Sequence, residues 1–320
     1  MDPTTTTATI TTTVNRRRRR KVIVIMGPTG AGKSRLSIDL VKRYFHNAEI
    51  INSDKMQVYK GLNHTTNKIT LQERKEVPHH LLGEIDPSRP VFTPSDFRKR
   101  GSGIISLVKS RWKIPFIVGG SNSFIYSLLT KRFDPGQDVF NGPDPDPICS
   151  DLRYDVCFIW VDVCLPVLNN YLSRRVDEML ECGMFDELSS FFRSGEYKKV
   201  NRSGLGQAIG VPEFEEYFSK FDRDDDDVEG YFGKSSERAD EYEDVVRRIK
   251  ENTCQLAKRQ VAKILRLRDG GWDLNRVDAT EAFKAVLASD GGGGGSRVSE
   301  IWEKQVVEPS MKIVKRFLDE

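Results

Sequence analysis

The feature that most constrains this chain is residues 27–34, whose glycine, lysine and serine spacing matches the consensus G-x-x-x-x-G-K-[ST]. A short apolar run, residues 22–26, precedes the motif, and an amphipathic stretch, residues 33–45, follows it. This order of strand, glycine-rich turn and helix predicts a loop whose backbone N–H groups converge on an anion. The residues expected to surround the phosphate are Gly27, Pro28, Thr29, Gly30, Ala31, Gly32, Lys33 and Ser34.

Two side chains of this motif carry specific chemistry. Lys33 is expected to place a positive charge against the phosphates, and the hydroxyl of Ser34 is expected to ligate Mg²⁺. The alternative is a glycine-rich turn that binds nothing, but a chance match in a chain of this length has a probability on the order of a percent. The motif therefore predicts phosphate binding and leaves the reaction open.

Strand and helix patterns alternate along the rest of the chain. Apolar runs typical of buried strands cover residues 22–26, 48–53, 114–118 and 156–163. Helical spacing of apolar residues covers residues 33–45, 93–109, 165–180 and 242–268. This alternation predicts an α/β fold, in which a P-loop NTPase-like parallel sheet is flanked by helices and accompanied by a smaller helical subdomain.

Composition shifts suggest where the predicted domains begin and end. We expect a core from residues 22–180 together with 241–290, and a small helical subdomain from residues 181–240. Within that subdomain, residues 219–240 are rich in aspartate and are expected to form a mobile insertion. Residues 291–296 predict a glycine linker, and residues 297–320 predict a C-terminal helix.

The net charge of +3 comes from one end of the chain. Residues 1–21 hold six basic residues against a single acid, Asp2, so the remainder carries a net charge of −2. A nearly neutral body argues against a surface built mainly to bind polyanions such as RNA. No apolar run reaches the roughly 18–20 residues that cross a bilayer, so we expect no membrane span.

The N-terminal tail bears on cellular location. Residues 1–21 are rich in threonine and arginine and poor in acids, which is typical of an organellar transit peptide and favours a plastid protein. The alternative is a disordered, positively charged arm on a cytoplasmic protein.

Two acids follow predicted strands, where ligands of open α/β sheets bind. Position favours a functional Asp54, because it ends the strand that follows the phosphate-loop helix, whereas Asp162 is better explained as a strand-end capping residue. A basic stretch at residues 247–268 includes Lys258 and Arg259. These two side chains lie near the predicted packing boundary of a helix, so they could close over phosphates or could simply face solvent.

Further motifs resemble those of the isopentenyltransferase family. They occur in the family's order and span about residues 22–268. They are GPT at residues 27–29, INSD at 51–54, PHHLL at 78–82, SDFR at 95–98, GGS at 119–121, RVDEML at 175–180, AIGVPE at 208–213 and LAKRQ at 256–260. The family transfers a dimethylallyl group from its diphosphate to N6 of adenine. One branch modifies tRNA, and a cytokinin-forming branch modifies free adenine nucleotides.

Departures from the tRNA branch favour the second branch. Only residues 131–155 separate the GGS motif region from the next strand, where tRNA enzymes carry a large helical insertion. Residues 210–213 read GVPE in place of the typical Gly-Tyr-Arg/Lys-Gln. The chain is therefore similar to plant adenylate isopentenyltransferases. This resemblance implies an enzyme that uses dimethylallyl diphosphate and prefers ATP or ADP over AMP, with no tRNA partner. We also expect a monomer.

The resemblance also implies roles for single residues. Asp54 would be the general base for the adenine amine, and Thr29 would hydrogen-bond the bridging oxygen of the diphosphate. Lys33 and Arg175 would hold that diphosphate, and Ser34 would bind Mg²⁺. The remaining residues expected to contact nucleotide or diphosphate are Ser53, Ser121, Lys258 and Arg259. The alternatives are a tRNA dimethylallyltransferase, a P-loop nucleotide or small-molecule kinase, and a nucleotide-binding module without catalysis.

Overall fold

The fold is built on a parallel β-sheet in a computed structural model that describes residues 20–142, 144–221, 236–289 and 295–320. The strands of these residues are β1 (Lys21–Met26), β2 (Ala48–Asn52), β3 (His79–His80), β4 (Ile114–Gly119), β5 (Asp155–Asp162) and β6 (Leu274–Asp278). Their order across the sheet is β3-β2-β4-β1-β5-β6, and every described pairing is parallel. The predicted α/β class with a parallel sheet is confirmed.

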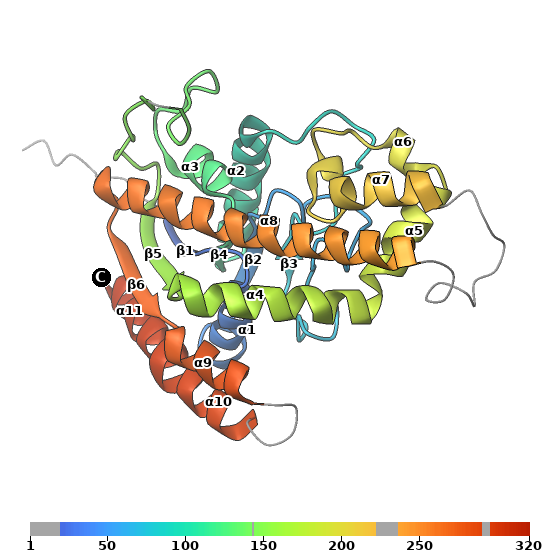
Figure 1. The fold of residues 1–320 in the computed structure, drawn as a ribbon. Coiled ribbons are helices and arrows are strands. Elements are labelled where there is room, and N and C mark those ends of the chain that lie inside the picture. The colour runs from blue at the N-terminus through green and yellow to red at the C-terminus, as the bar shows by residue number, and fades with distance from the viewer. Residues whose placement is uncertain (1–19, 143, 222–235, 290–294) are drawn as a thin grey trace, which may run out of the picture.

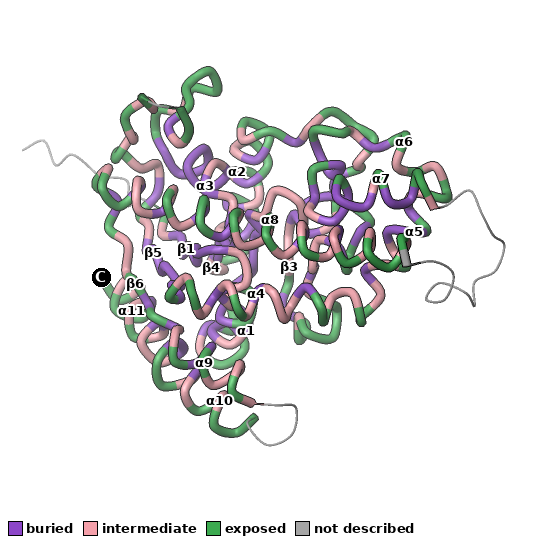
Figure 2. Tube along the Cα trace, viewed as in Figure 1, coloured by how far each residue is buried: buried purple, intermediate pink, exposed green. Residues whose placement is uncertain are grey.

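Helices cover both faces of this sheet (Figure 1). On one face α2 (Pro94–Ser110) and α3 (Asn122–Leu129) pack against alternate residues of β1, beginning with Val22. On the other face α1 (Lys33–Arg43) and α9 (Thr280–Ala288) pack against the intervening residues, beginning with Ile23. Because successive strand side chains point to opposite faces, both faces of each central strand must be apolar, and Figure 2 shows these strands buried.

Two long helices run side by side and lead into a lobe of short helices (Figure 1). They are α4 (Leu165–Met179) and α8 (Ser236–Asp269). The lobe contains η1 (Leu180–Met184), α5 (Phe185–Arg193), α6 (Glu196–Lys199), η2 (Leu205–Gln207) and α7 (Val211–Phe221). Phe185 packs edge-on against Phe214 at 5.6 Å between ring centroids, so aromatic stacking organises the lobe.

The boundaries of the predicted acidic insertion, residues 219–240, are wrong at both ends. Helix α7 continues to Phe221 and α8 begins at Ser236, several residues before the predicted start of that helix. Aromatic packing of α7 against α8, with Tyr217 and Tyr242 6.1 Å apart between centroids, favours helix where composition alone suggested loop. Residues 222–235 lie outside the described residues.

The C-terminal prediction also needs correction. Gly295 and Ser296, expected in the glycine linker 291–296, form the first turn of α10 (Gly295–Trp302), and residues 290–294 lie outside the described residues. The predicted single helix 297–320 is interrupted by a π-helical segment, η4 (Glu303–Val307), before α11 (Glu308–Asp319). Pro309 lies in the first turn of α11, and it cannot donate a helical hydrogen bond back to the preceding turn.

The short strand β3 was not predicted, because two residues carry no periodicity that the sequence could reveal. Between α3 and β5, the described residues 130–142 and 144–154 contain no helix. Among the described residues, no helix has the length and apolar character that a bilayer crossing requires.

Candidate active site

The phosphate loop joins β1 to α1 at the point where the chain's strand order reverses around β1. Gly30 has a φ of +78°, and a Cβ there would lie 2.5 Å from Cδ2 of Leu172, so only glycine fits. Gly32, at φ +84°, precedes α1 as its N-cap and provides no side-chain cap. The first amide groups of α1 are therefore left for an anion, as the motif predicted.

Lys33 is the first residue of α1, and its side chain reaches back to the phosphate loop that precedes it. Its ammonium donates a hydrogen bond to the carbonyl oxygen of Pro28 at 2.6 Å. Burial lowers the pKa of Lys33 to about 8, an effect that the carboxylate of Asp54 opposes and the guanidinium of Arg175 reinforces. Lys33, Asp54 and Arg175 are thus within electrostatic range of one another, although they come from three distant parts of the chain.

Asp54 follows β2 and is held by the turn that it begins. Its Oδ1 accepts hydrogen bonds from the backbone N–H groups of Met56 at 2.9 Å and Gln57 at 3.2 Å. Oδ2 has no hydrogen-bond partner among the described residues, so one carboxylate oxygen is fixed while the other is available to a substrate. Asp162, the other strand-end acid, instead pairs with Arg276 at 2.7 Å, which fits the structural role favoured from sequence.

Arg175 extends from α4 toward the same position. Burial lowers the pKa of its guanidinium, while the charge of Asp54 acts in the opposite direction. The side-chain amide of Asn67 faces the guanidinium of Arg175.

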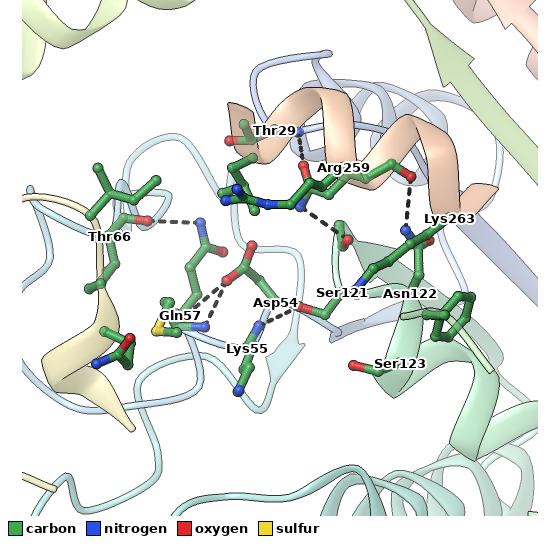
Figure 3. Close-up of a pocket in the computed structure, with 18 of the residues that line it drawn as sticks. Thr29, Asp54, Lys55, Gln57, Thr66, Ser121, Asn122, Ser123, Arg259 and Lys263 are labelled. Carbon is green, nitrogen blue, oxygen red and sulfur yellow. Dashed lines mark hydrogen bonds between the residues drawn. The ribbon is translucent and has the colours of Figure 1, made fainter. Parts of the chain in front are cut away.

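Asp54, Asn67 and Arg175 line a cavity of about 780 Å³, shown in close-up in Figure 3. Of the predicted site residues, the structure brings Thr29, Asp54, Ser121, Arg175 and Arg259 to its wall. Apolar side chains make up much of the remainder. They include Met56, Tyr126, Phe133, Val139, Phe140, Leu172, Val176 and Leu256. A cavity that combines a few charged groups with an apolar lining suits a substrate that has an ionic end and a hydrocarbon end.

The other predicted contact residues do not line this cavity: they are Gly27, Pro28, Gly30, Ala31, Gly32, Lys33, Ser34, Ser53 and Lys258. Ser53 is fully buried because its hydroxyl packs against Gly119, where an added Cβ would lie 2.5 Å from Oγ. Lys258 is exposed, because it lies one residue outside the α8 stripe that faces the cavity. Ser34 is exposed at the start of α1, on the loop itself. Ser53 and Lys258 thus lie outside the cavity wall, and their contacts with nucleotide or diphosphate stay predictions.

Gln260 is a site residue that sequence reasoning missed. Its Oε1 accepts a hydrogen bond from the backbone N–H of Thr29 at 2.6 Å, and its Nε2 donates to the carbonyl of Gly120 at 3.1 Å. Asn122 donates to the backbone carbonyl of Gln260 at 3.1 Å. The LAKRQ motif contained this residue, but charge drew the prediction to its two basic neighbours. Gln260 ties the phosphate loop to the end of β4 through α8.

Lys68 was also missed, because it lies in a loop with no recognisable pattern. Its ammonium donates to the carbonyl of Gly61 at 2.6 Å and to Oγ1 of Thr66 at 2.9 Å. Burial lowers the pKa of Lys68 to about 8, and the charges of Glu187 and Asp54 oppose this effect. Lys68 therefore adds a third cation to the surroundings of Asp54, beside Lys33 and Arg175.

The connection of residues 130–154 forms another wall of the cavity, and α8 holds it in place. Arg266 donates hydrogen bonds from Nη2 to the carbonyl oxygens of Pro145 at 2.9 Å and Asp146 at 2.8 Å, and from Nε to that of Val139. One turn earlier on α8, the ammonium of Lys263 lies 5.6 Å from the ring centroid of Phe140. This wall depends on contacts between segments more than a hundred residues apart.

Fold and site together define a P-loop α/β protein whose phosphate loop opens beside a carboxylate and a partly apolar cavity. The IPP transferase family model matches this chain over residues 57–147 and 135–264. The chain belongs to the IPP transferase family, and the resemblance seen in its motifs is thereby confirmed.

Over most of its length the chain is similar to proteins named adenylate isopentenyltransferases. The chain is 55% identical to the adenylate isopentenyltransferase of Humulus lupulus, in an alignment that covers 92% of this chain and 90% of the relative. It is 51% identical to adenylate isopentenyltransferase 1, chloroplastic, of Arabidopsis thaliana, over 92% of this chain and 80% of the relative.

Solved structures agree on the fold. A eukaryotic dimethylallyltransferase acting on tRNA superposes with a TM-score of 0.71 at 26% identity, covering 94% of this chain and 80% of the other. The tRNA isopentenylpyrophosphate transferase of Bacillus halodurans gives a TM-score of 0.65 at 22% identity, covering 94% of this chain and all of the other. This chain therefore shares its fold with enzymes whose names state tRNA as the acceptor.

Proposed function

We propose that this protein transfers the dimethylallyl group of dimethylallyl diphosphate to N6 of the adenine of a free nucleotide, with ATP or ADP preferred over AMP. The observation that carries this proposal is the unpartnered Oδ2 of Asp54, at the wall of a cavity shared with Thr29 and Arg175. The adenylate isopentenyltransferases at 51–55% identity support the same reaction, which forms isopentenyladenine nucleotides in cytokinin biosynthesis.

The base role of Asp54 follows from the chemistry of the acceptor. The N6 lone pair of adenine is delocalised into the ring, so the amine is a poor nucleophile until its proton is removed. As N6 forms a bond to C1 of the dimethylallyl group, the C–O bond to diphosphate breaks and Oδ2 of Asp54 takes the N6 proton. The backbone N–H groups of Met56 and Gln57 hold the other carboxylate oxygen, which orients Oδ2.

The leaving diphosphate needs positive charge and hydrogen-bond donors. We propose that the loop amides, Lys33 and Arg175 hold it, and that Thr29 donates a hydrogen bond to its bridging oxygen. Thr29 and Arg175 line the cavity, and Lys33 lies within electrostatic range of Asp54 and Arg175, which supports these roles. Ser34, whose hydroxyl makes no hydrogen bond to another described residue, fits a Mg²⁺ ion that is shared with the diphosphate. Such an ion would neutralise charge on the leaving group. Among the described residues there is no cluster of three acids, histidines or cysteines to form an all-protein metal cage, which agrees with a cation held largely by substrate.

The geometry of the acceptor side supports a free nucleotide. Residues 130–154 close one wall of the cavity as a compact loop, tied down by Arg266. By the family resemblance, enzymes of the tRNA branch carry a large tRNA-binding helical insertion at this position. Arg259 and Lys263, both on the cavity wall, supply charge for the nucleotide phosphates.

The reaction is tested by incubating the protein with Mg²⁺, dimethylallyl diphosphate and ATP, ADP or AMP, followed by mass analysis. We expect adenine nucleotides heavier by one five-carbon unit, with ATP and ADP consumed faster than AMP. Phosphate transfer without such a product would instead identify a kinase, product on a tRNA acceptor alone would identify a tRNA enzyme, and no product would identify a binding module.

The base assignment has its own test in Asp54→Asn, which keeps the two turn hydrogen bonds but cannot accept the proton. We expect kcat to fall by about 10²–10⁴-fold while the KM of the nucleotide changes little. Near-normal turnover would remove Asp54 from the base role, and a changed KM alone would make it a binding residue.

The proposal also covers the cellular location and the oligomeric state of the protein. We propose a plastid protein, supported by the acid-poor tail and by several relatives that are named chloroplastic, although one is named mitochondrial. We also propose that the protein is a monomer. Import of a tagged full-length chain into isolated plastids and light scattering of the purified protein test these two statements.

A further inference from the structure

The C-terminal helices pack against the helix that begins at the phosphate loop. Helices α10 and α11, with the π-helical segment η4 between them, lie on the α1 side of the sheet (Figure 1). None of their residues lines the cavity. The contact between η4 and α1 therefore joins a segment outside the cavity wall to the helix that begins at the phosphate loop.

Trp302, the last residue of α10, touches the loop itself. A Cβ on Gly32 would lie 2.6 Å from Cη2 of Trp302, so the indole ring occupies the space beside this glycine. Gly32 has a φ of +84° and is the N-cap of α1. Glycine is conformationally permissive, so a ring packed against it restricts the positions that its peptide groups can adopt.

Three contacts fix the indole ring. Trp302 is only 3% exposed, and its Nε1 donates a hydrogen bond to Oδ2 of Asp39 at 2.9 Å. The guanidinium of Arg35 lies 4.7 Å from the ring centroid, in a cation–π contact. Both partners belong to the first two turns of α1, so the ring is clamped to the helix that carries Lys33 and Ser34.

The residue after Trp302 makes a further contact with α1. Glu303 accepts hydrogen bonds from the guanidinium of Arg43, at the last turn of α1, with 2.7 Å between Nη2 and Oε1. Trp302 and Glu303 reach α1 together because the π-helical segment begins at Glu303 and alters the helical spacing there. Wider turns of this kind are frequent at functional sites.

We propose that Trp302 is a positioning residue for the diphosphate site, because it holds Gly32 and the first amides of α1 in the conformation that receives the anion. The identity of this anion as the prenyl donor rests on the proposed function. Electrostatic stabilisation of a leaving group requires donors that are already oriented, and small displacements of such donors reduce catalysis strongly. The residue does not touch the reacting atoms and acts through the loop.

The experiment measures binding of inorganic diphosphate by calorimetry, and KM for each substrate separately, in the full chain. In Trp302→Leu we expect the Kd for diphosphate and the KM of dimethylallyl diphosphate to rise about tenfold, with the nucleotide KM within about twofold of wild type. Trp302→Phe keeps a ring against Gly32 but loses the hydrogen bond to Asp39. We expect it to show a smaller rise in the same direction.

Val314→Ala is the matched control, because Val314 is fully buried on α11, in the same C-terminal segment, and packs toward β5 and β6. This variant should lower stability and leave diphosphate binding unchanged. The proposal is overturned if Trp302→Leu binds diphosphate as wild type does, if both KM values rise equally, or if Val314→Ala shows the same loss.

Two provisions keep the outcomes separate. If Trp302→Leu does not fold, Trp302→Phe decides, and an unchanged Kd in that variant overturns the proposal. Because diphosphate binding is measured without prenyl transfer, a wild-type protein that binds diphosphate but forms no prenylated nucleotide contradicts the proposed function and leaves the positioning role to be judged by Kd.

Discussion

Two walls of the same cavity are built in opposite ways. The wall at Thr29 belongs to one contiguous motif, residues 27–34, whose conformation follows from glycine positions and the start of α1. The wall at Phe133–Phe140 is an irregular loop whose place is set by Arg266, from a helix more than a hundred residues away. Local sequence therefore specifies the conformation of the phosphate loop, and tertiary contacts specify the shape of the cavity beside it.

This difference explains how one fold accommodates enzymes named for different acceptors. A phosphate loop that depends on backbone amides tolerates little change, since each glycine meets a nearby atom. A loop wall that is anchored at a few backbone carbonyls can change length while the sheet beneath it stays the same. The structural similarity to tRNA enzymes at 22–26% identity, with TM-scores of 0.65–0.71, fits this division.

Within this comparison, the largest loss of activity is expected from a change in the phosphate loop, residues 27–34. Lys33→Met removes the charge nearest the loop but preserves much of the side-chain length. We expect kcat/KM for dimethylallyl diphosphate to fall by about 10²–10³-fold, because a pre-oriented donor to the leaving group is lost. Single-turnover kinetics with saturating ATP would measure this.

The comparison breaks if Lys33→Met leaves donor kinetics intact and raises only the nucleotide KM. That outcome would place the nucleotide, rather than the prenyl diphosphate, in the phosphate loop, as the kinase alternative requires.

A smaller effect is expected at the cavity wall formed by residues 133–140. Arg266→Gln removes the hydrogen bonds to Val139, Pro145 and Asp146, and loosens the loop without changing a cavity side chain. We expect the KM of the nucleotide to rise about tenfold while the KM of dimethylallyl diphosphate stays within about twofold. Steady-state kinetics with each substrate varied in turn would measure this.

Arg268→Gln is the matched control for this prediction, because Arg268 is exposed on the same helix and pairs only with its neighbour Asp269 among the described residues. It should behave as wild type. Equal rises in both KM values for Arg266→Gln would show that the two walls are not independent.

The smallest expected effect concerns pH. The pKa of Lys33 is about 8 because burial disfavours its charged form, so the free protein loses this charge as pH rises through 8. A bound diphosphate stabilises the charged form, and binding above pH 8 must therefore take up a proton. We expect the affinity for inorganic diphosphate to fall about fivefold between pH 7 and pH 8.7.

Lys33→Met supplies the control, because its weaker residual binding should show no such decline over this interval. A wild-type affinity that stays constant to pH 8.7 would show that Lys33 keeps its proton, and that burial matters less on this wall than the nearby charge of Asp54.

Much of the site could be predicted because it lies at ends of strands that are recognisable from apolar runs. Thr29, Asp54 and Ser121 each follow such a run, and parallel strands bring their carboxyl ends to one edge. Gln260 and Lys68 were missed for different reasons. Gln260 acts through hydrogen bonds to backbone groups of remote segments, and Lys68 lies in a loop without periodicity.

Ser53 and Lys258 are adjacent in sequence to Asp54 and Arg259, which line the cavity, but they do not line it themselves. Successive side chains point in different directions, turning by about 100° per residue in a helix. A one-residue offset therefore moves a side chain from the cavity to the core or to solvent.

The sequence by itself determined the phosphate loop, the parallel α/β sheet and the carboxylate after β2, because each depends on residues close together in the chain. Packing between remote segments decided that Gln260 bonds to that loop, that Arg175 and Lys68 lie within electrostatic range of Asp54, that Arg266 anchors the opposing wall, and that Trp302 packs on Gly32. The physical reason is that these contacts join groups far apart in sequence, and only the packing of the sheet and its helices brings them within hydrogen-bond or van der Waals distance.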